Sequence, residues 1–172
     1  MITYFSKLGV QHLEQQIVEQ GRVVVEAGQQ VGEEAGIACD WHDNFGFEEA
    51  RRRLDIESGR LKTLKSLREQ AQLAPPPNTE SNRVVIGSKV TFHLGETQKS
   101  FIIGAWAETL PKLGMVAYDS PIAKLVIGLQ VGATRDVTFQ GKETEVEVIS
   151  ILNDGQEYSE KLIILYGLQS ND

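Results

Sequence analysis

The chain has 172 residues, of which 41% are hydrophobic and 24% are charged, a composition typical of a soluble globular protein and unlike that of a disordered or fibrous one. The formal net charge of -7 argues against general nucleic-acid binding, which needs a basic face for phosphates. No apolar run approaches the roughly 18 residues of a membrane span. The single cysteine, Cys39, cannot form an internal disulfide, and the N-terminus lacks the basic-then-apolar order of a signal peptide. We therefore predict a cytoplasmic protein that contacts no membrane.

The first segment, roughly residues 4–34, is predicted to be a long helix. Its apolar residues recur at alternating spacings of three and four, which is the heptad pattern of a coiled coil. Each glycine within it lowers helix propensity by about 1 kcal/mol relative to alanine, so contacts with another element must compensate. The core series, which is weak at its one polar member, is Val10, Leu13, Ile17, Gln20, Val24, Ala27 and Val31.

A second helix is predicted over roughly residues 43–73. Asp43 or Asn44 can cap its first turn, and its apolar heptad is broken by Glu57 and Arg68. If the two helices fold back on each other, they form an antiparallel hairpin about 40 Å long at 1.5 Å per residue.

The second helix is also distinctly basic. A solvated face with ion pairs such as Glu48–Arg52 and Glu49–Arg53 accounts for the run, and a stripe that lies along RNA or an acidic channel wall is the alternative. The basic residues are Arg51, Arg52, Arg53, Arg60, Lys62, Lys65 and Arg68.

The stretch between the helices, residues 39–47, combines two carboxylates with three aromatic rings. Asp40 and Asp43 converge if this stretch is helical or tightly turned, and Mg²⁺ is commonly held by only one or two protein carboxylates. The simpler interpretation is that both acids only cap a helix. Trp41 is a candidate for stacking on an RNA base or for closing the end of the hairpin, whereas Phe47 keeps the heptad and is expected to pack inward.

Three consecutive prolines, residues 75–77, end the helical region and begin a linker over residues 75–82. Beyond it the hydrophobic period changes to two, which predicts strands at 84–87, 89–93, 99–106, 115–118, 136–140 and 143–152. Gly141 with Lys142 supplies the turn between the last two strands. The predicted fold is therefore α+β, with an antiparallel helical hairpin in residues 1–74 and a small antiparallel sheet domain in residues 83–172.

One short helix is predicted within the second domain. Ser120 is a natural N-cap, Pro121 suits the first helical position, and Gly128 ends the helix. The apolar run over residues 161–168 is expected to add an edge strand or to pack across the sheet, and otherwise to form an exposed patch for a partner.

The segment Ser120–Gly128, together with residues 131–137, resembles, in the order of its residues, a sequence block and the following strand of the Gre-type (GreA/GreB) transcript-cleavage factors of bacterial RNA polymerase. The stretch between the helices is similar to the same family's tip. Asp40 matches the family's aspartate there, Asp43 its glutamate, Asn44 its asparagine and Phe47 its aromatic residue. The positions that depart from the family pattern are Trp41, His42, Phe45 and Gly46.

This resemblance implies an FKBP-like C-terminal domain that docks at the rim of the polymerase's secondary channel, with Ser120, Pro121 and Lys124 as docking residues. The coiled coil would pass down the channel, where Asp40 and Asp43 would hold Mg²⁺ jointly with the polymerase. Hydrolysis of a backtracked RNA 3′ end would follow. The protein would be a monomeric accessory factor rather than an enzyme, with no metal in its isolated form.

Other interpretations stay open. A non-cleaving regulator that binds the secondary channel and blocks it fits the altered tip. A prolyl isomerase would share the FKBP-like fold, but no aromatic-lined pocket can be identified in the sequence. A transition-metal site at His42 lacks a second histidine or a thiolate at a recognised spacing other than Cys39.

Overall fold

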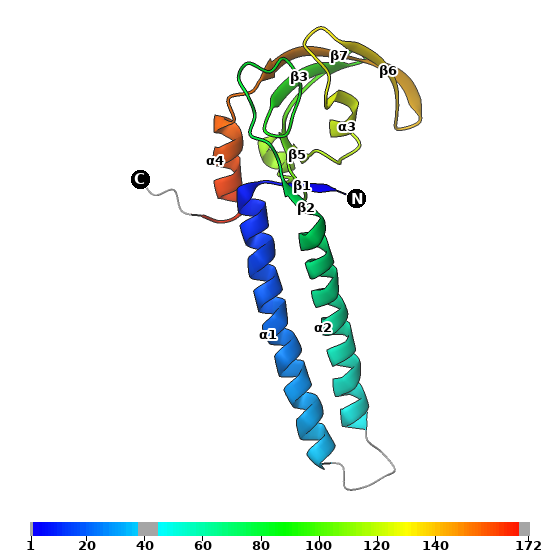
Figure 1. Cartoon of the computed structure of the whole chain (residues 1–172). Coiled ribbons are helices and arrows are strands. Elements are labelled where there is room, and N and C mark those ends of the chain that lie inside the picture. The colour runs from blue at the N-terminus through cyan, green and yellow to red at the C-terminus, as the bar shows by residue number, and fades with distance from the viewer. Residues whose placement is uncertain (1, 38–44, 169–172) are drawn as a thin grey trace. The chain divides into compact units, whose positions relative to one another are not determined.

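The computed structural model describes residues 2–37 and 45–168 (Figure 1). Its residues group into two compact units, one made of Met1–Thr3 and Val10–Ala71 and the other of Tyr4–Gly9 and Gln72–Asp172. Within the described ranges, no helix is both long enough and apolar enough to cross a bilayer.

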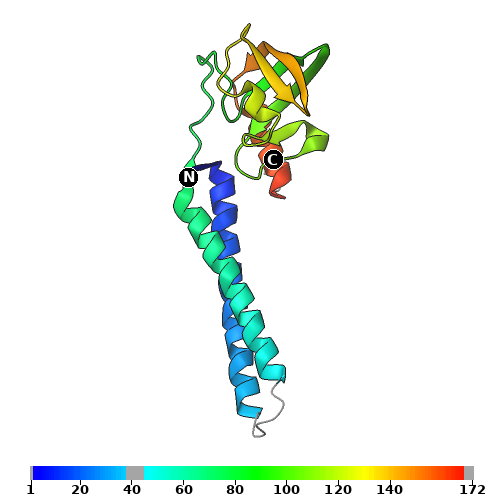
Figure 2. The same cartoon turned by 90° about the vertical axis from the view of Figure 1, so that its right-hand side faces the viewer.

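The first unit is a hairpin of two long helices, α1 (Lys7–Ile37) and α2 (Phe45–Gln70), which lie side by side in both side views (Figures 1 and 2). The predicted helical hairpin is confirmed, but its ends differ from the prediction. Helix α1 begins at Lys7 because the Ser6 hydroxyl caps it, accepting a hydrogen bond from the Gly9 amide at 2.9 Å. The flanking residues form two short strands that pair with each other, β1 (Thr3–Phe5) and β2 (Ala71–Leu73).

The seam between α1 and α2 is only partly apolar. Leu13, Ala27 and Ala50 are buried, while the other core-facing residues are half-buried, as expected for two helices that cover only one face of each other. The polar residues that interrupt the two heptads are paired across the seam: the Gln20 amide donates to Glu57 at 2.7 Å. Nearer the start of α1, Arg68 binds Glu14 at 2.8 Å, and further along α1, Arg53 donates to Gln30 at 3.0 Å.

The second unit is built on a five-stranded sheet in the order β5-β4-β3-β7-β6. Its strands are β3 (Lys89–Leu94), β4 (Thr97–Gly104), β5 (Met115–Ala117), β6 (Thr134–Phe139) and β7 (Lys142–Leu152). The sheet is mixed rather than antiparallel, because β5 pairs parallel to β4 after a long connection that contains the 3-10 helix η1 (Pro111–Leu113). Residues 84–87, predicted as a strand, do not form one: an isolated bridge joins Arg83 to Gln130, and Val84 exchanges backbone hydrogen bonds with Gly128 and Leu129.

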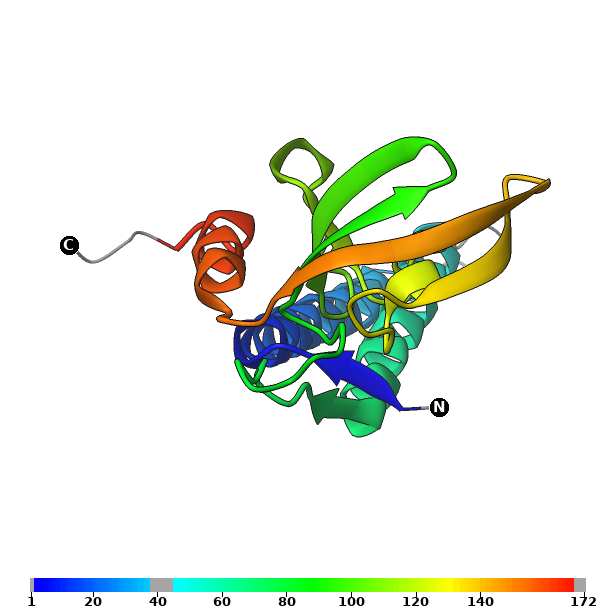
Figure 3. The ribbon, with the colours of Figure 1, turned by 90° about the horizontal axis from the view of Figure 1, so that it is seen from above.

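The β6–β7 hairpin (Figure 3) forms where the sequence predicts it, but its turn is Gln140–Gly141 and Lys142 is already the first residue of β7, paired with Phe139. Gln140 and Gly141 both have positive φ, 52° and 78°, which is the backbone of the turn favoured in two-residue hairpins. Along β7, Val146 and Val148 are buried while Glu145 and Glu147 are exposed. The predicted alternation of side chains along this strand, with one solvent-exposed face and one buried face, is confirmed.

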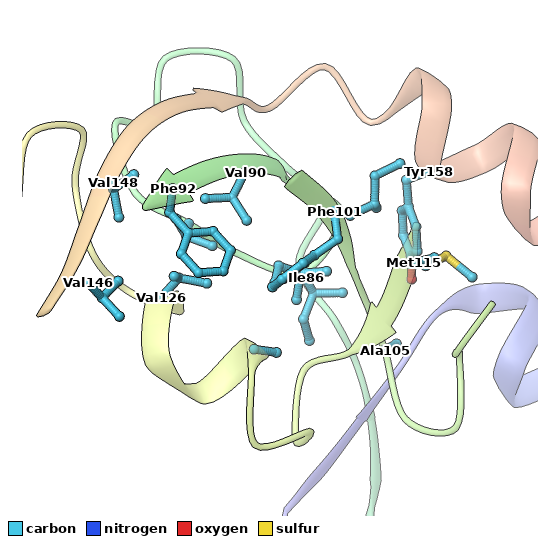
Figure 4. Packing of buried hydrophobic residues seen from close by; sticks show 14 of the residues in the cluster. Ile86, Val90, Phe92, Phe101, Ala105, Met115, Val126, Val146, Val148 and Tyr158 are labelled. Atoms are coloured by element: carbon cyan, nitrogen blue, oxygen red, sulfur yellow. The ribbon is translucent and has the colours of Figure 1, made fainter. Parts of the chain in front are cut away.

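The core of this unit lies between the sheet and the short helix α3 (Ala123–Val126) (Figure 4). Phe92 and Phe101 meet edge to face, with ring centroids 5.3 Å apart. Val126 of α3 is fully buried in the same cluster. This packing fixes the position of the segment that follows Ser120.

The apolar tail forms a helix, α4 (Gln156–Leu165), rather than the edge strand that was one expectation. Its Tyr158 and Leu162 side chains are buried in the core, so the run packs on the domain instead of extending the sheet. A buried carboxylate anchors it: Glu108 accepts hydrogen bonds from the Tyr158 hydroxyl at 2.5 Å and the Tyr166 hydroxyl at 3.1 Å. The Ser6 hydroxyl and the Ala105 amide also donate to Glu108.

Candidate functional site

The first part of the candidate site is the end of the helical hairpin. Helix α1 ends at Ile37 and α2 begins at Phe45. Asp40, Trp41, Asp43 and Asn44 belong to the connection between them and lie outside the described residues. Their predicted roles as metal-directed carboxylates and tip contacts therefore stay predictions.

The first turn of α2, next to this connection, is described. Phe45 is 74% exposed, whereas Phe47 is half-buried, in accord with its place in the heptad. The Glu34 side chain of α1 lies against Gly46, since a Cβ atom at Gly46 would be 2.5 Å from Glu34 Oε2. The two helices are thus in close contact immediately before the connection, and Phe45, whose ring is exposed, is the first residue after it.

Sequence reasoning favoured Trp41 as the external aromatic contact and did not single out Phe45. The signal was present, because Phe45 lies outside the heptad that Phe47 continues. An exposed aromatic ring at this point can stack on a nucleobase or fill an apolar pocket of a partner.

The start of α2 carries an acidic residue. Glu48 lies in the first turn, where a negative charge favours the helix dipole. No group of three or more histidine, cysteine, aspartate or glutamate side chains comes together as a metal site in residues 2–37 and 45–168. In their chemistry, Asp40 and Asp43 offer the hard oxygen ligands that Mg²⁺ prefers.

The basic run on α2 is largely engaged within the hairpin. Arg52 pairs with Glu49 at 3.8 Å and Arg60 with Glu57 at 2.8 Å, both three residues apart. The sequence predicted pairs four residues apart, Glu48–Arg52 and Glu49–Arg53. Instead, Arg53 donates to Gln30 of α1 and does not bind Glu49. Such exposed pairs are typically worth about 0.2–1 kcal/mol each. They support the interpretation of this run as a solvated helix face.

The second part of the candidate site is the segment from Ser120 to Gly128. Its helix is shorter than predicted, since α3 spans only Ala123–Val126. The Ser120 hydroxyl accepts a hydrogen bond from the Ala123 amide at 3.2 Å and its carbonyl accepts one from the Lys124 amide, so Ser120 makes the contacts of a cap, although α3 itself begins only at Ala123. Gly128, with φ of 80°, ends the segment as expected. Pro121 and Lys124 are exposed and available to a partner.

An apolar groove of about 370 Å³ adjoins this segment. The Tyr118 ring, which precedes Ser120, meets Tyr4 edge to face at 6.1 Å on one side, and Ile127 and Gly128 contribute the other end of the segment. Sequence reasoning missed the groove because its walls come from parts of the chain that are far apart. The complete lining is Tyr4, Pro75, Val84, Val85, Ile86, Tyr118, Ile127 and Gly128.

Comparison with known proteins identifies relatives of this chain. The family described as "Transcription elongation factor, GreA/GreB, C-term" matches residues 78–153. Transcription elongation factor GreA of Lactococcus lactis subsp. cremoris is 30% identical over 114 residues, which cover 65% of this chain and 73% of that protein. Transcription elongation factor GreA of Bacillus licheniformis is 32% identical over 115 residues, which cover 65% of this chain and 72% of that protein.

Among solved structures, the GreA factor homolog 1 (Gfh1) of Thermus thermophilus is similar at 20% identity and a TM-score of 0.41, covering 88% of this chain and 99% of that one. The GreA relatives carry the assignment, because the similarity extends over 73% and 72% of their own length at 30% and 32% identity. The chain belongs to the GreA/GreB family of transcription elongation factors.

Proposed function

We propose that this protein binds bacterial RNA polymerase, places the end of its helical hairpin in the secondary channel and stimulates Mg²⁺-dependent cleavage of backtracked RNA. The observation that carries the proposal is the hairpin of α1 and α2, whose connection contains Asp40 and Asp43. It is supported by the family to which the chain belongs.

The length of the hairpin suits a role at a distance. A helix of 31 residues such as α1 extends about 46 Å at 1.5 Å per residue. Its exposed surface is mostly polar, so it can remain in water inside a solvated channel. An arm of this kind brings side chains at its end to a reaction centre that belongs to another protein.

The two carboxylates fit the chemistry of assisted phosphodiester hydrolysis. A divalent ion in such a site activates water as the nucleophile and stabilises charge on the phosphate. On this chain, Asp40 and Asp43 would supply oxygen ligands from outside the polymerase, and the polymerase would supply the remaining ligands. Phe45, which is exposed at the start of α2, would contact the RNA end or the channel wall.

Docking would be the task of the second unit. Pro121 and Lys124 are exposed on the segment ordered by Ser120, and the end of the same segment, at Ile127 and Gly128, lines the apolar groove. An apolar groove beside an exposed lysine suits a partner helix with one apolar and one acidic face.

A non-cleaving regulator of the polymerase is the second candidate. The observation that favours it is in the sequence: where the family pattern has glutamate, this chain has Asp43, whose side chain is shorter by one methylene. The reach is reduced by roughly 1–1.5 Å on ordinary bond lengths, and a misplacement of about 1 Å can cost about 100-fold in rate. Such a factor would still enter the channel.

The deciding experiment mixes the protein with stalled, backtracked elongation complexes and Mg²⁺ and measures the length of the RNA. We expect shortened RNA with the natural protein, and a loss of about 100-fold or more in the rate of shortening with Asp40→Asn plus Asp43→Asn. The matched control is Asp55→Asn on the exposed surface of α2, which should cleave like the natural protein.

Binding is measured separately, by competition of each variant with the natural protein for the polymerase. If the natural protein binds without shortening the RNA, the regulator is the correct function. If it does not bind the polymerase, both proposals are wrong.

A further inference from the structure

The middle of the helical hairpin is intrinsically weak in both helices. Gly21 of α1 and Gly59 of α2 flank the level at which Gln20 meets Glu57. Glycine is the weakest helix former apart from proline. Neither position requires glycine, because both lie in helical backbone and a Cβ atom there would meet none of the described residues within 4 Å.

A second feature weakens α2 at the same level. The Thr63 hydroxyl donates to the Gly59 carbonyl at 3.0 Å. A threonine that bonds back to the carbonyl four residues earlier competes with the helix's own hydrogen bond and tends to bend the helix. The two helices are therefore both prone to bend or unwind at one point along their length.

A directed polar contact spans this point. The Gln20 amide nitrogen donates to the Glu57 backbone carbonyl at 3.1 Å and to its carboxylate at 2.7 Å. The other Glu57 oxygen accepts from Arg60 at 2.8 Å. The Glu57 side chain is only 13% exposed, and the Gln20 hydrogen bond lowers the pKa of its carboxyl group.

This contact differs in kind from the apolar layers around it. Aliphatic side chains such as Ile17 and Leu61 can slide past one another with little loss, whereas a hydrogen bond to a backbone carbonyl is lost by a small displacement. A shift would also leave an amide and a carboxylate facing an apolar seam, which is costly. Polar layers of this type fix alignment in coiled coils at some expense of stability.

We infer that Gln20 and Glu57 are positioning residues: they brace the hairpin across its weak level and so hold the distal half of the arm, towards residues 38–44, in a fixed place relative to the proximal half. The consequence for RNA cleavage rests on the proposed function. The structural consequence does not.

The test places pairs of spin labels in the natural chain carrying Cys39→Ser and measures the distribution of distances in each pair. The distal pair, Gln15→Cys with Arg51→Cys, spans the Gln20–Glu57 contact, and the proximal control pair, Gln15→Cys with Lys65→Cys, lies wholly on one side of it; all three positions are exposed. Gln20→Met removes the amide and keeps an unbranched side chain of similar length. We expect it to broaden the distal distribution and to leave the proximal one unchanged.

Two further variants separate a brace from a general contribution to stability. Gly21→Ala with Gly59→Ala strengthens both helices, so adding this pair to Gln20→Met should restore the narrow distal distribution. Glu57→Gln keeps the backbone carbonyl and one side-chain oxygen as acceptors for the Gln20 amide and loses only the oxygen that accepts from Arg60, so it should broaden the distal distribution less than Gln20→Met does. An unchanged distal distribution in Gln20→Met, or a broad one that the alanines do not narrow, would overturn the inference.

Transcript shortening provides the functional readout with the same variants. Gln20→Met should lower its rate about tenfold or more, because small misplacements of reacting groups are costly, and the two alanines should recover it. Normal shortening in a variant with a broad distal distribution would show that bracing is not needed for cleavage. If the natural chain shortens no RNA, the proposed function is wrong, but the distances between the spin labels still test whether Gln20 and Glu57 hold the two halves of the arm in place.

Discussion

The helical hairpin and the C-terminal domain are stabilised in different ways. In the described part of α1 and α2, the only buried hydrophobic residues are Leu13, Ala27 and Ala50. Polar contacts such as Gln20–Glu57 and Glu14–Arg68 also join the two helices. The domain has a continuous core under its sheet, with Phe92, Ile103 and Met115 fully or almost fully buried. The stability of the hairpin thus depends on the alignment of its two helices, and that of the domain on the packing of its core. A glycine-to-alanine substitution should therefore act differently in each.

The largest effect is expected from Gly104→Ala in the domain. A Cβ atom there would lie 2.3 Å from the Glu108 backbone carbonyl, and the turn that follows β4 would have to move. Overpacking of this kind costs about 1–3 kcal/mol, and here it also displaces the carboxylate that anchors α4. Urea unfolding should show the loss. An unchanged midpoint would mean that this turn is not closely packed.

A smaller effect is expected at alkaline pH. Burial, followed by the nearby Glu108 charge, raises the pKa of Tyr158 above its ordinary value of 10.0. The folded state then holds a proton that the unfolded state releases, so stability is constant below about pH 10 and falls above it, by up to about 1.4 kcal/mol per pH unit.

The control for this pH dependence is Tyr158→Phe. It removes the titrating hydroxyl and should make the decline in urea midpoint above about pH 10 shallower, although it lowers stability near neutrality by deleting a hydrogen bond to Glu108. An equally steep decline in this variant would assign the alkaline loss to other groups.

The smallest effect, and one of opposite sign, is expected from Gly28→Ala in the hairpin. A Cβ atom at Gly28 would meet none of the described residues within 4 Å, so the change costs no packing. The gain in helix propensity should raise stability by about 0.5–1 kcal/mol. Thermal unfolding followed by helical circular dichroism measures it. A loss of stability would show that this face of α1 is packed against something.

The heptads predicted the hairpin because long amphipathic helices carry a strong periodic signal. Gln20, Glu57 and Arg68 were identified only as interruptions, since a pattern taken along one helix cannot show that an interruption in one meets a partner in the other. The strands β1 and β2 were missed for a related reason: three residues are too few to show a period, and Ser6 had not been identified as the cap that starts α1.

In the second unit the alternating strands and the Gly141 turn were predictable, but the parallel pairing of β5 was not, because nothing local distinguishes a returning strand from a new hairpin. The run at residues 161–168 was too uniformly apolar to show a helical period, so α4 was missed. Glu108 gave no signal at all. A lone acid in a connection looks like any solvated residue until three hydroxyl groups from distant parts of the chain converge on it.

The central claim is that the end of the hairpin reaches the RNA end inside the polymerase, and a photo-cross-link tests it most directly. A photoreactive amino acid at Phe45, which is exposed beside the connection, is compared with the same group at Val25, which is exposed along α1. In backtracked elongation complexes we expect the group at position 45, and not the one at position 25, to cross-link to the 3′-terminal part of the RNA. Cross-linking to this RNA from both positions equally, or from neither in complexes that contain the bound protein, would contradict the account.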